Sequence, residues 1–219
     1  MSRKGQQTKE KILTTARDLV MQKGFAGTSI DDILKGGPYS KGQFFHHFGS
    51  KADLATELVK WHAGRDIEMF RTTLAQAETR SDDPLAQMML FLKMFERYIS
   101  NENEPSLGCM YAVYTYESMQ FDPSIRDFVA DTLRDWTAIY VRKFQEILEC
   151  YEPARPVTAR QLAEMIVSII EGALVLQRAY GNVTMTARQS AHFRDYLELL
   201  FGTDGKTNSG EEKRLGTAA

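Results

Sequence analysis

Residues 28–51 read TSIDDILKGGPYSKGQFFHHFGSK, a helix-forming stretch with two clear breaks. The glycines and proline of Gly36-Gly37-Pro38 cannot continue a helical hydrogen-bond ladder, so they separate two short helices. The first begins at Thr28, whose side chain can cap the free N–H groups of the first turn. The second spans residues 40–46, and Gly49-Ser50 is the next break. The stretch therefore predicts a helix, a tight turn and a second helix within about twenty residues.

Longer helices flank this pair on both sides. Apolar residues recur at helical spacing over residues 8–23, and Gly24 follows them as a C-terminal signal. A fourth helix is expected to begin at Lys51, with Ser50 in position to cap it. Residues 1–52 are therefore expected to form one small helical domain with a helix-turn-helix.

The rest of the chain predicts a second helical domain over residues 53–203, and hence an all-α fold. Helix-breaking segments that contain Pro, Asp and Gly divide this domain into about five helices. Residues 159–180 are the most apolar, and residues 185–201 are amphipathic and aromatic. We expect these two helices to form a dimer interface, although the pattern also fits helices that serve only the core. Residues 204–219 lack apolar anchors and are expected to be a disordered tail.

Composition argues against several classes of protein. A chain of 219 residues with 43% hydrophobic residues can bury one large core or two modest ones. No stretch approaches eighteen consecutive apolar residues, and residues 1–11 lack the apolar segment of a signal peptide. We therefore expect a cytoplasmic protein without a membrane partner. Cys109 and Cys150 form no CxxC pair and have no histidine at metal-ligand spacing, so we expect reduced thiols and no metal site.

Charge is distributed unevenly along the chain. Residues 1–60 contain ten basic and six acidic side chains, whereas residues 61–219 contain seventeen and twenty-three. A basic head on an acidic body fits a protein that presents one end to a polyanion, with chance variation between solvated faces as the alternative. Helix, turn and helix over residues 28–48, joined to a basic N-terminal arm, is the geometry that inserts a helix into the DNA major groove.

The first sixty residues resemble the TetR/AcrR family of transcriptional regulators. The resemblance is carried by Ile12-Leu13, Ala16, Gly24-Phe25, Thr28-Ser29-Ile30, Asp32-Ile33 and the run Ser40-Lys41-Gly42-Gln43-Phe44-Phe45-His46-His47-Phe48-Gly49-Ser50-Lys51. Downstream, only the number of helices and Glu171-Gly172-Ala173-Leu174 are similar to the family. The resemblance implies a repressor that binds a palindromic operator in double-stranded DNA as a homodimer and is released by a small-molecule inducer.

The resemblance also implies which residues contact DNA. The exposed N-terminal part of the recognition helix holds Ser40, Lys41, Gly42 and Gln43. Gly42 permits close approach, and Gln43 can pair with adenine through N6 and N7. Phosphate contacts are expected from Thr28, His46 and Lys51. His47 and Phe48 are expected to hold the third helix against the fourth.

Two positions depart from the family pattern. Phe45 stands where the family usually has a tyrosine whose hydroxyl reaches a phosphate, and a phenylalanine cannot make that hydrogen bond. Pro38-Tyr39 stands where a glycine and a small aliphatic residue are usual. Tyr39 is large for the tip of the turn and is expected to touch DNA itself, so both Phe45 and Tyr39 remain among the expected DNA-facing residues.

The larger domain is expected to bind the inducer. Aromatic and methionine side chains are dense between Met88 and Tyr140, and most of them are expected to be core. The phenols of Tyr111 and Tyr114 are candidates for ligand contacts. Cys109 stands at the expected start of a helix, where the positive end of the dipole can make a thiol reactive. Some members of the family sense electrophiles with a cysteine in this neighbourhood, and a buried structural thiol is the alternative.

An enzyme is not expected. The sequence has no Gly-rich phosphate loop, no nucleophile elbow and no metal motif, so we expect no catalytic residue and no cofactor. A helical adaptor remains an alternative for the larger domain, but it leaves the basic head unexplained.

Overall fold

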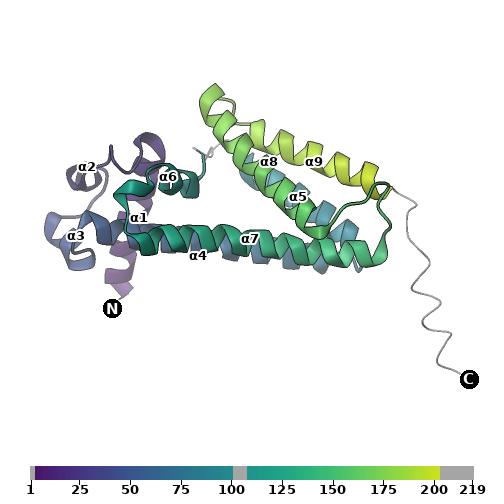
Figure 1. Ribbon diagram of the computed structural model, residues 1–219. Coiled ribbons are helices and arrows are strands. Elements are labelled where there is room, and N and C mark those ends of the chain that lie inside the picture. The colour runs from purple at the N-terminus through teal and green to yellow at the C-terminus, as the bar shows by residue number, and fades with distance from the viewer. Residues whose placement is uncertain (1–2, 101–107, 203–219) are drawn as a thin grey trace, which may run out of the picture. The chain divides into compact units, whose positions relative to one another are not determined.

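The computed structural model describes residues 3–100 and 108–202. Within these ranges the chain is helical and contains no β-strand, which confirms the all-α prediction. The elements are α1 (Arg3–Lys23), α2 (Ile30–Lys35), α3 (Lys41–His47), α4 (Lys51–Glu78), α5 (Pro84–Ile99), α6 (Met110–Tyr116), the short 3-10 helix η1 (Ser118–Gln120), α7 (Pro123–Cys150), α8 (Ala159–Tyr180) and α9 (Met185–Phe201) (Figure 1). The tail expected at residues 204–219 lies outside the described residues.

The described residues fall into two compact units. The head unit contains the chain up to Glu68 together with residues 108–133, and the body unit contains residues 69–100 and 134–202. The sequence placed a boundary between residues 52 and 53. In the structure α6, η1 and the first turns of α7 also belong to the head unit, because Tyr114, Phe121 and Ile125 complete its apolar core.

The head unit is built on α1, whose apolar stripe is fully buried. Ile12, Ala16 and Val20 are each inaccessible to solvent. Gly24 ends the helix with a positive φ of 79°, a backbone conformation that favours glycine. The predicted C-terminal signal is therefore confirmed, while α1 begins earlier than expected, at Arg3.

The cap of α2 differs from the prediction. Ser29, not Thr28, is the N-cap: its hydroxyl oxygen accepts a hydrogen bond from the Asp32 N–H at 3.0 Å. The Asp32 carboxylate accepts in return from the Ser29 N–H at 2.9 Å and pairs with Lys23 at 2.8 Å. Either hydroxyl can cap a helix. Thr28 is turned inward because its hydroxyl donates to the Gly24 carbonyl at 2.7 Å.

The body unit contains the predicted helix pair. α8 and α9 have the bounds that the sequence predicted and pack side by side (Figure 1), and α5 packs on α9. Five α-helices follow α4 in the described part of the chain, as expected. The buried ammonium of Lys143 on α7 lies 2.9 Å from Glu78 and donates to Gln87 at 2.8 Å, which ties α7 to α4 and α5.

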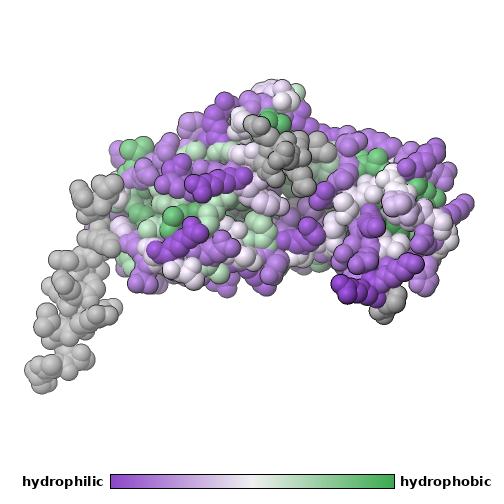
Figure 2. Space-filling model, turned by 180° about the vertical axis from the view of Figure 1, so that it is seen from behind, coloured by the Kyte–Doolittle hydropathy of each residue, from purple (hydrophilic) through white to green (hydrophobic). Residues whose placement is uncertain are grey.

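The surface seen in Figure 2 is largely hydrophilic, with hydrophobic residues gathered in patches. Among the residues that the structure describes, no helix has the length and apolar content needed to span a membrane.

Candidate nucleic-acid interface

The first turn of α3 is fixed by a reciprocal cap. The Ser40 hydroxyl oxygen accepts a hydrogen bond from the Gln43 backbone N–H at 3.2 Å, and the Gln43 side-chain Oε1 accepts from the Ser40 backbone N–H at 2.8 Å. This capping box satisfies two N–H groups that the helix itself leaves unpaired. It begins α3 at Lys41, one residue later than the sequence suggested.

One face of α3 is buried and the other is exposed. Phe44 and Phe48 anchor the helix in the head core with their ring centroids 5.5 Å apart, and Phe48 is buried as predicted. The exposed side chains of α3 and its N-cap are those of Ser40, Lys41, Gln43, Phe45 and His46. The first turn contains no acidic residue, so this face is suited to a polyanion.

Gly42 lies in the middle of this exposed face. A methyl group at its Cα would meet only the Ser40 hydroxyl, at 3.8 Å, which is ordinary contact. The fold of the head therefore does not require glycine here. A backbone without a side chain permits close approach by a ligand, and the DNA contact expected of Gly42 stays a prediction.

Two expected DNA contacts are buried instead. Thr28 is 1% exposed and its hydroxyl is engaged by Gly24, so its side chain cannot reach a phosphate in this conformation. Tyr39 is 8% exposed and belongs to the head core. Its ring covers Gly37, where a Cβ would approach the Tyr39 ring to 2.3 Å. Both side chains are therefore buried in the head in this conformation, and the DNA contacts expected of Thr28 and Tyr39 stay predictions.

Lys51 is half-buried and engaged within the head. Its ammonium donates to the Phe25 carbonyl at 2.7 Å and lies 4.5 Å from the centroid of the Phe25 ring. Burial lowers the pKa of Lys51, and the nearby Glu117 carboxylate opposes that change. Any phosphate contact by Lys51 has to compete with, or add to, its bond with Phe25.

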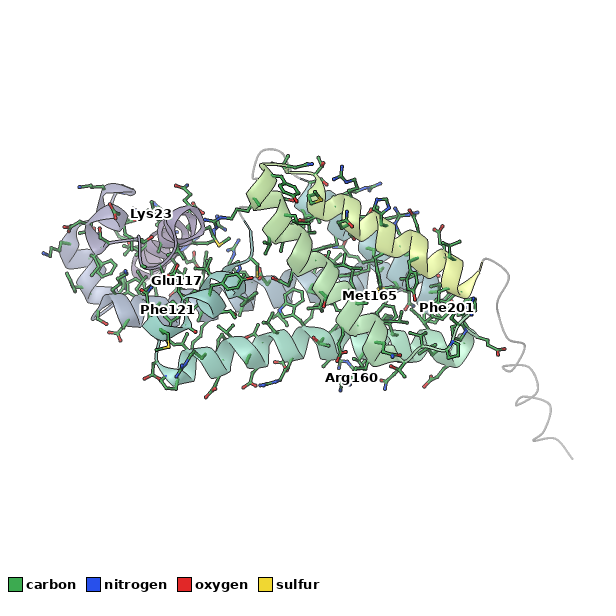
Figure 3. The ribbon with its side chains drawn as sticks, turned by 45° about the horizontal axis from the view of Figure 1, so that its top comes forward. Lys23, Glu117, Phe121, Arg160, Met165 and Phe201 are labelled. Atoms are coloured by element: carbon green, nitrogen blue, oxygen red, sulfur yellow. The ribbon has the colours of Figure 1, made fainter. Side chains whose placement is uncertain are left out.

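Glu117 is a residue that sequence reasoning missed. Its two carboxylate oxygens accept hydrogen bonds from the backbone N–H groups of Phe25, at 3.0 Å, and Ala26, at 2.7 Å (Figure 3). The Phe25 ring packs on Phe121 with centroids 5.0 Å apart. These contacts hold the turn after α1 against the segment that follows α6. No local pattern could reveal them, because Glu117 lies 92 residues from Phe25 in the sequence.

The two adjacent histidines of α3 differ in their exposure to solvent. His46 is exposed and His47 is half-buried, with their ring centroids 5.0 Å apart. Burial lowers the pKa of His47, and the charges of His46 and Lys9 act in the same direction. His46 is therefore the one of the two that can face a phosphate.

The expected ligand residues all lie in the head unit. Tyr114 is buried and its hydroxyl donates to the Ala55 carbonyl at 2.7 Å. Tyr111 donates to Asp66 at 3.0 Å, and His62 lies 3.2 Å from the same carboxylate. Cys109 is half-buried at the N-cap of α6. Both phenol hydroxyls thus have internal partners.

Burial is the main cause of the pKa changes of His62 and Asp66, the ionisable pair on α4. It raises the pKa of Asp66 and lowers the pKa of His62, so both groups are pushed toward their neutral forms. The residues described by the structure contain no group of three or more His, Cys, Asp or Glu side chains that could hold a metal ion.

Two models of known protein families match the chain. Residues 12–58 match the family model described as bacterial regulatory proteins, tetR family, and residues 84–191 match the model of the LmrA/YxaF-like C-terminal domain. The first match contains α2 and α3 entirely, so it covers the helix-turn-helix described above.

Full-length relatives support the same assignment. The chain is 29% identical over 170 residues to YxaF of Bacillus subtilis, covering 77% of this chain and 84% of YxaF. It is 26% identical over 192 residues to the regulator LmrA of the same organism, covering 87% and 97%. The crystal structure of a TetR regulator from Chloroflexus aurantiacus superposes with a TM-score of 0.75 at 27% identity, covering 91% of this chain and 99% of that one. The chain therefore belongs to the TetR family of DNA-binding transcriptional regulators.

Proposed function

We propose that this regulator is a cytoplasmic repressor that binds a palindromic operator as a homodimer and leaves it when a small molecule binds. The observation that carries the proposal is the exposed first turn of α3, where Lys41, Gly42 and Gln43 stand together on a face without acidic residues. Backbone phosphates would be contacted by Lys41 and His46, and base edges by Gln43.

The homodimer is inferred from α8 and α9. Among the residues that the structure describes, six of the ten exposed large hydrophobic side chains lie on these helices or on the turn between them: Met165, Val175, Leu176, Tyr180, Val183 and Leu199. Met165, Val175 and Leu176 lie along one side of α8, together with Gly172 (Figure 3 labels Met165). Apart from the adjoining backbone of α8 itself, no atom of the described residues lies within 4 Å of a Cβ built at Gly172, so another helix could approach closely there.

A two-fold dimer matches the symmetry of a palindrome. Its two α3 helices would read half-sites about 34–36 Å apart, or a multiple of that distance. An inducer releases such a dimer from its operator if the inducer binds more tightly to a conformation in which the two heads are separated by a different distance. A coupling free energy of about 1–3 kcal/mol would change operator affinity roughly 5- to 150-fold.

The inducer is proposed to bind in the body unit rather than at Tyr111 and Tyr114. An aromatic cluster there contains Phe70, Phe91, Trp136 and Tyr140, with the Phe70 and Trp136 ring centroids 4.8 Å apart. The buried Nε1 of Trp136 has no hydrogen-bond partner in the described part of the chain. A buried donor without a partner is unfavourable, so an apolar ligand with one acceptor atom would suit it. Thermal-shift screening of wild type against Trp136→Phe tests this assignment.

The function is tested by selection from fragmented genomic DNA of the source organism at near-physiological salt. Wild type is compared with Lys41→Ala and with Lys93→Ala, which removes an exposed lysine on α5 in the body unit. We expect an enriched inverted repeat with wild type and Lys93→Ala, and weaker enrichment with Lys41→Ala. No enriched sequence, with no duplex binding even at low salt, would contradict the proposal.

A further inference from the structure

The side chain of Gln43 is already committed at one of its two ends. A carboxamide has an oxygen that only accepts hydrogen bonds and a nitrogen that only donates them. The Ser40 backbone N–H can bind only the oxygen, and Gln43 Oε1 lies 2.8 Å from it. The acceptor end therefore faces the start of α3, and the Nε2 amino group is left for an external partner.

This division of the amide bears on which base Gln43 can read. A glutamine that pairs with adenine uses both ends at once, accepting from N6 and donating to N7. With Oε1 turned to its own helix, Gln43 can donate but cannot complete that pair. Guanine instead presents two adjacent acceptors, O6 and N7, whereas thymine presents one acceptor beside a methyl group.

We propose that Gln43 is a specificity-determining residue that keeps its cap on DNA and reads guanine through Nε2 alone. The proposal rests on the proposed function, because it assumes that α3 faces the operator. It replaces the adenine contact expected from the sequence with a contact to an acceptor-only edge.

The other capping boxes of the chain show why glutamine suits this position. α2 uses Asp32 at the corresponding place, and its negative charge is balanced by Lys23 at 2.8 Å. α3 has no acidic residue in its first turn, so Gln43 supplies the same acceptor without a charge that would repel phosphates. One side chain thus combines the cap with an outward donor.

α8 provides a matched control for this chemistry. Thr158 and Gln161 form the same reciprocal box, with Thr158 N to Gln161 Oε1 at 2.9 Å and Gln161 N to Thr158 Oγ1 at 3.2 Å. Glu is a normal residue at this position of a capping box. Gln43→Glu and Gln161→Glu therefore both retain the cap acceptor, and each exchanges the amino group for a second acceptor.

The experiment is a selection from randomised duplexes with wild type, Gln43→Glu and Gln161→Glu, followed by titration of the best duplexes. We expect wild type and Gln161→Glu to enrich guanine at one position of each half-site. Gln43→Glu should lower the affinity for the guanine-containing duplex roughly 2- to 12-fold, the worth of a single hydrogen bond, and should favour cytosine, whose N4 amino group is a donor. Replacing the guanine by 7-deazaguanine should weaken wild type and Gln161→Glu but not Gln43→Glu.

The contrary outcomes are distinct. Adenine or thymine at the position that responds to Gln43→Glu would overturn the guanine assignment, and adenine would mean that the cap opens on DNA. Identical base preferences for wild type and Gln43→Glu would make Gln43 a cap only. If wild type and Gln161→Glu enrich no sequence at all, the proposed function fails and takes this inference with it.

Discussion

Glu117 and Phe25, 92 residues apart in sequence, are joined by a hydrogen bond from the Phe25 backbone N–H to Glu117 Oε1 at 3.0 Å. The second oxygen of the same carboxylate holds the N–H of Ala26. Lys51, the first residue of α4, donates to the carbonyl of Phe25. The turn that follows α1 is thus bonded to α4 on one side and to the end of α6 on the other.

Loss of this carboxylate is expected to loosen the turn. Glu117→Ala leaves two N–H groups without their acceptor, and we expect it to lower the free energy of unfolding by about 1–3 kcal/mol. Amide hydrogen exchange at Phe25 and Ala26 should accelerate by more than the loss of global stability alone explains. Glu68→Ala removes an exposed glutamate of α4 in the same unit and should do neither. Unchanged exchange at both amides in Glu117→Ala would disprove the role given to this bond.

Gly42 is expected to separate stability from DNA binding. Because an added methyl group meets no obstacle, Gly42→Ala should stabilise α3 by about 0.5–1 kcal/mol through helix propensity. The same methyl group should weaken operator binding by roughly tenfold or more if the backbone approaches DNA closely. Gly64→Ala, at an equally open helical glycine on α4, serves as the control with unchanged operator affinity. Equal affinities for all three proteins would remove Gly42 from the interface.

A charge on the apolar side of α8 is expected to disrupt the dimer. Val175 is 45% exposed, and Val175→Glu would place a carboxylate in the proposed interface, where burial of an unpaired charge is strongly unfavourable. Sedimentation should show a shift from dimer to monomer at micromolar concentration. Met119→Glu makes the comparable change at a residue that is 91% exposed in the head unit, and it should leave the dimer intact. A Val175→Glu protein that still sediments as a dimer would place the interface elsewhere.

The cap of α2 is expected to make the head sensitive to acid. The hydrogen bond from Lys23, followed by the backbone and side-chain bonds of Ser29, holds the pKa of Asp32 well below its ordinary value. Below about pH 4 the unfolded chain binds a proton at this residue that the folded head does not. The contribution of Asp32 is therefore present above that pH and is lost as the pH falls further.

Denaturant titrations between about pH 7 and pH 3 test whether the stability contributed by Asp32 is lost toward acid. Asp32→Asn should be less stable than wild type at neutral pH, and the difference should shrink below about pH 4. Asp31→Asn, at the exposed neighbouring carboxylate, should follow wild type throughout. A difference for Asp32→Asn that grows toward acid would contradict the assignment.

Local sequence signals were enough to predict most of the fold. The spacing of apolar residues and the helix-ending residues between the segments predicted α8 and α9 with their observed bounds. The prediction succeeded because the cap residues of these helices, Thr158, Gly181 and Gly202, are their direct neighbours in the sequence. The resemblance to the TetR/AcrR family implied the exposed first turn of α3, where the structure has Ser40, Lys41 and Gln43 exposed. The capping residue predicted for α2 was wrong: Thr28 and Ser29 can both cap a helix, but Ser29 forms the capping box with Asp32 while the Thr28 hydroxyl bonds to Gly24.

What the sequence missed depends on contacts between distant segments. Tyr39 was expected to touch DNA from the tip of the turn, yet its side chain belongs to the head core. The hydroxyls of Tyr111 and Tyr114 were expected to be available to a ligand, but their partners, Asp66 and Ala55, lie on α4. Neither outcome follows from the residues next to them in the chain.

The central claim is that α3 presents a sequence-specific DNA-reading surface, and a salt-dependent titration tests it most directly. Labelled duplexes that carry either the selected operator or its scrambled sequence are titrated with the full chain at several salt concentrations. We expect operator binding to be at least about 10³-fold tighter than binding to the scrambled duplex at physiological salt, with affinity for both falling steeply as salt rises. Equal affinity for the two duplexes, or no binding to either at low salt, would contradict it.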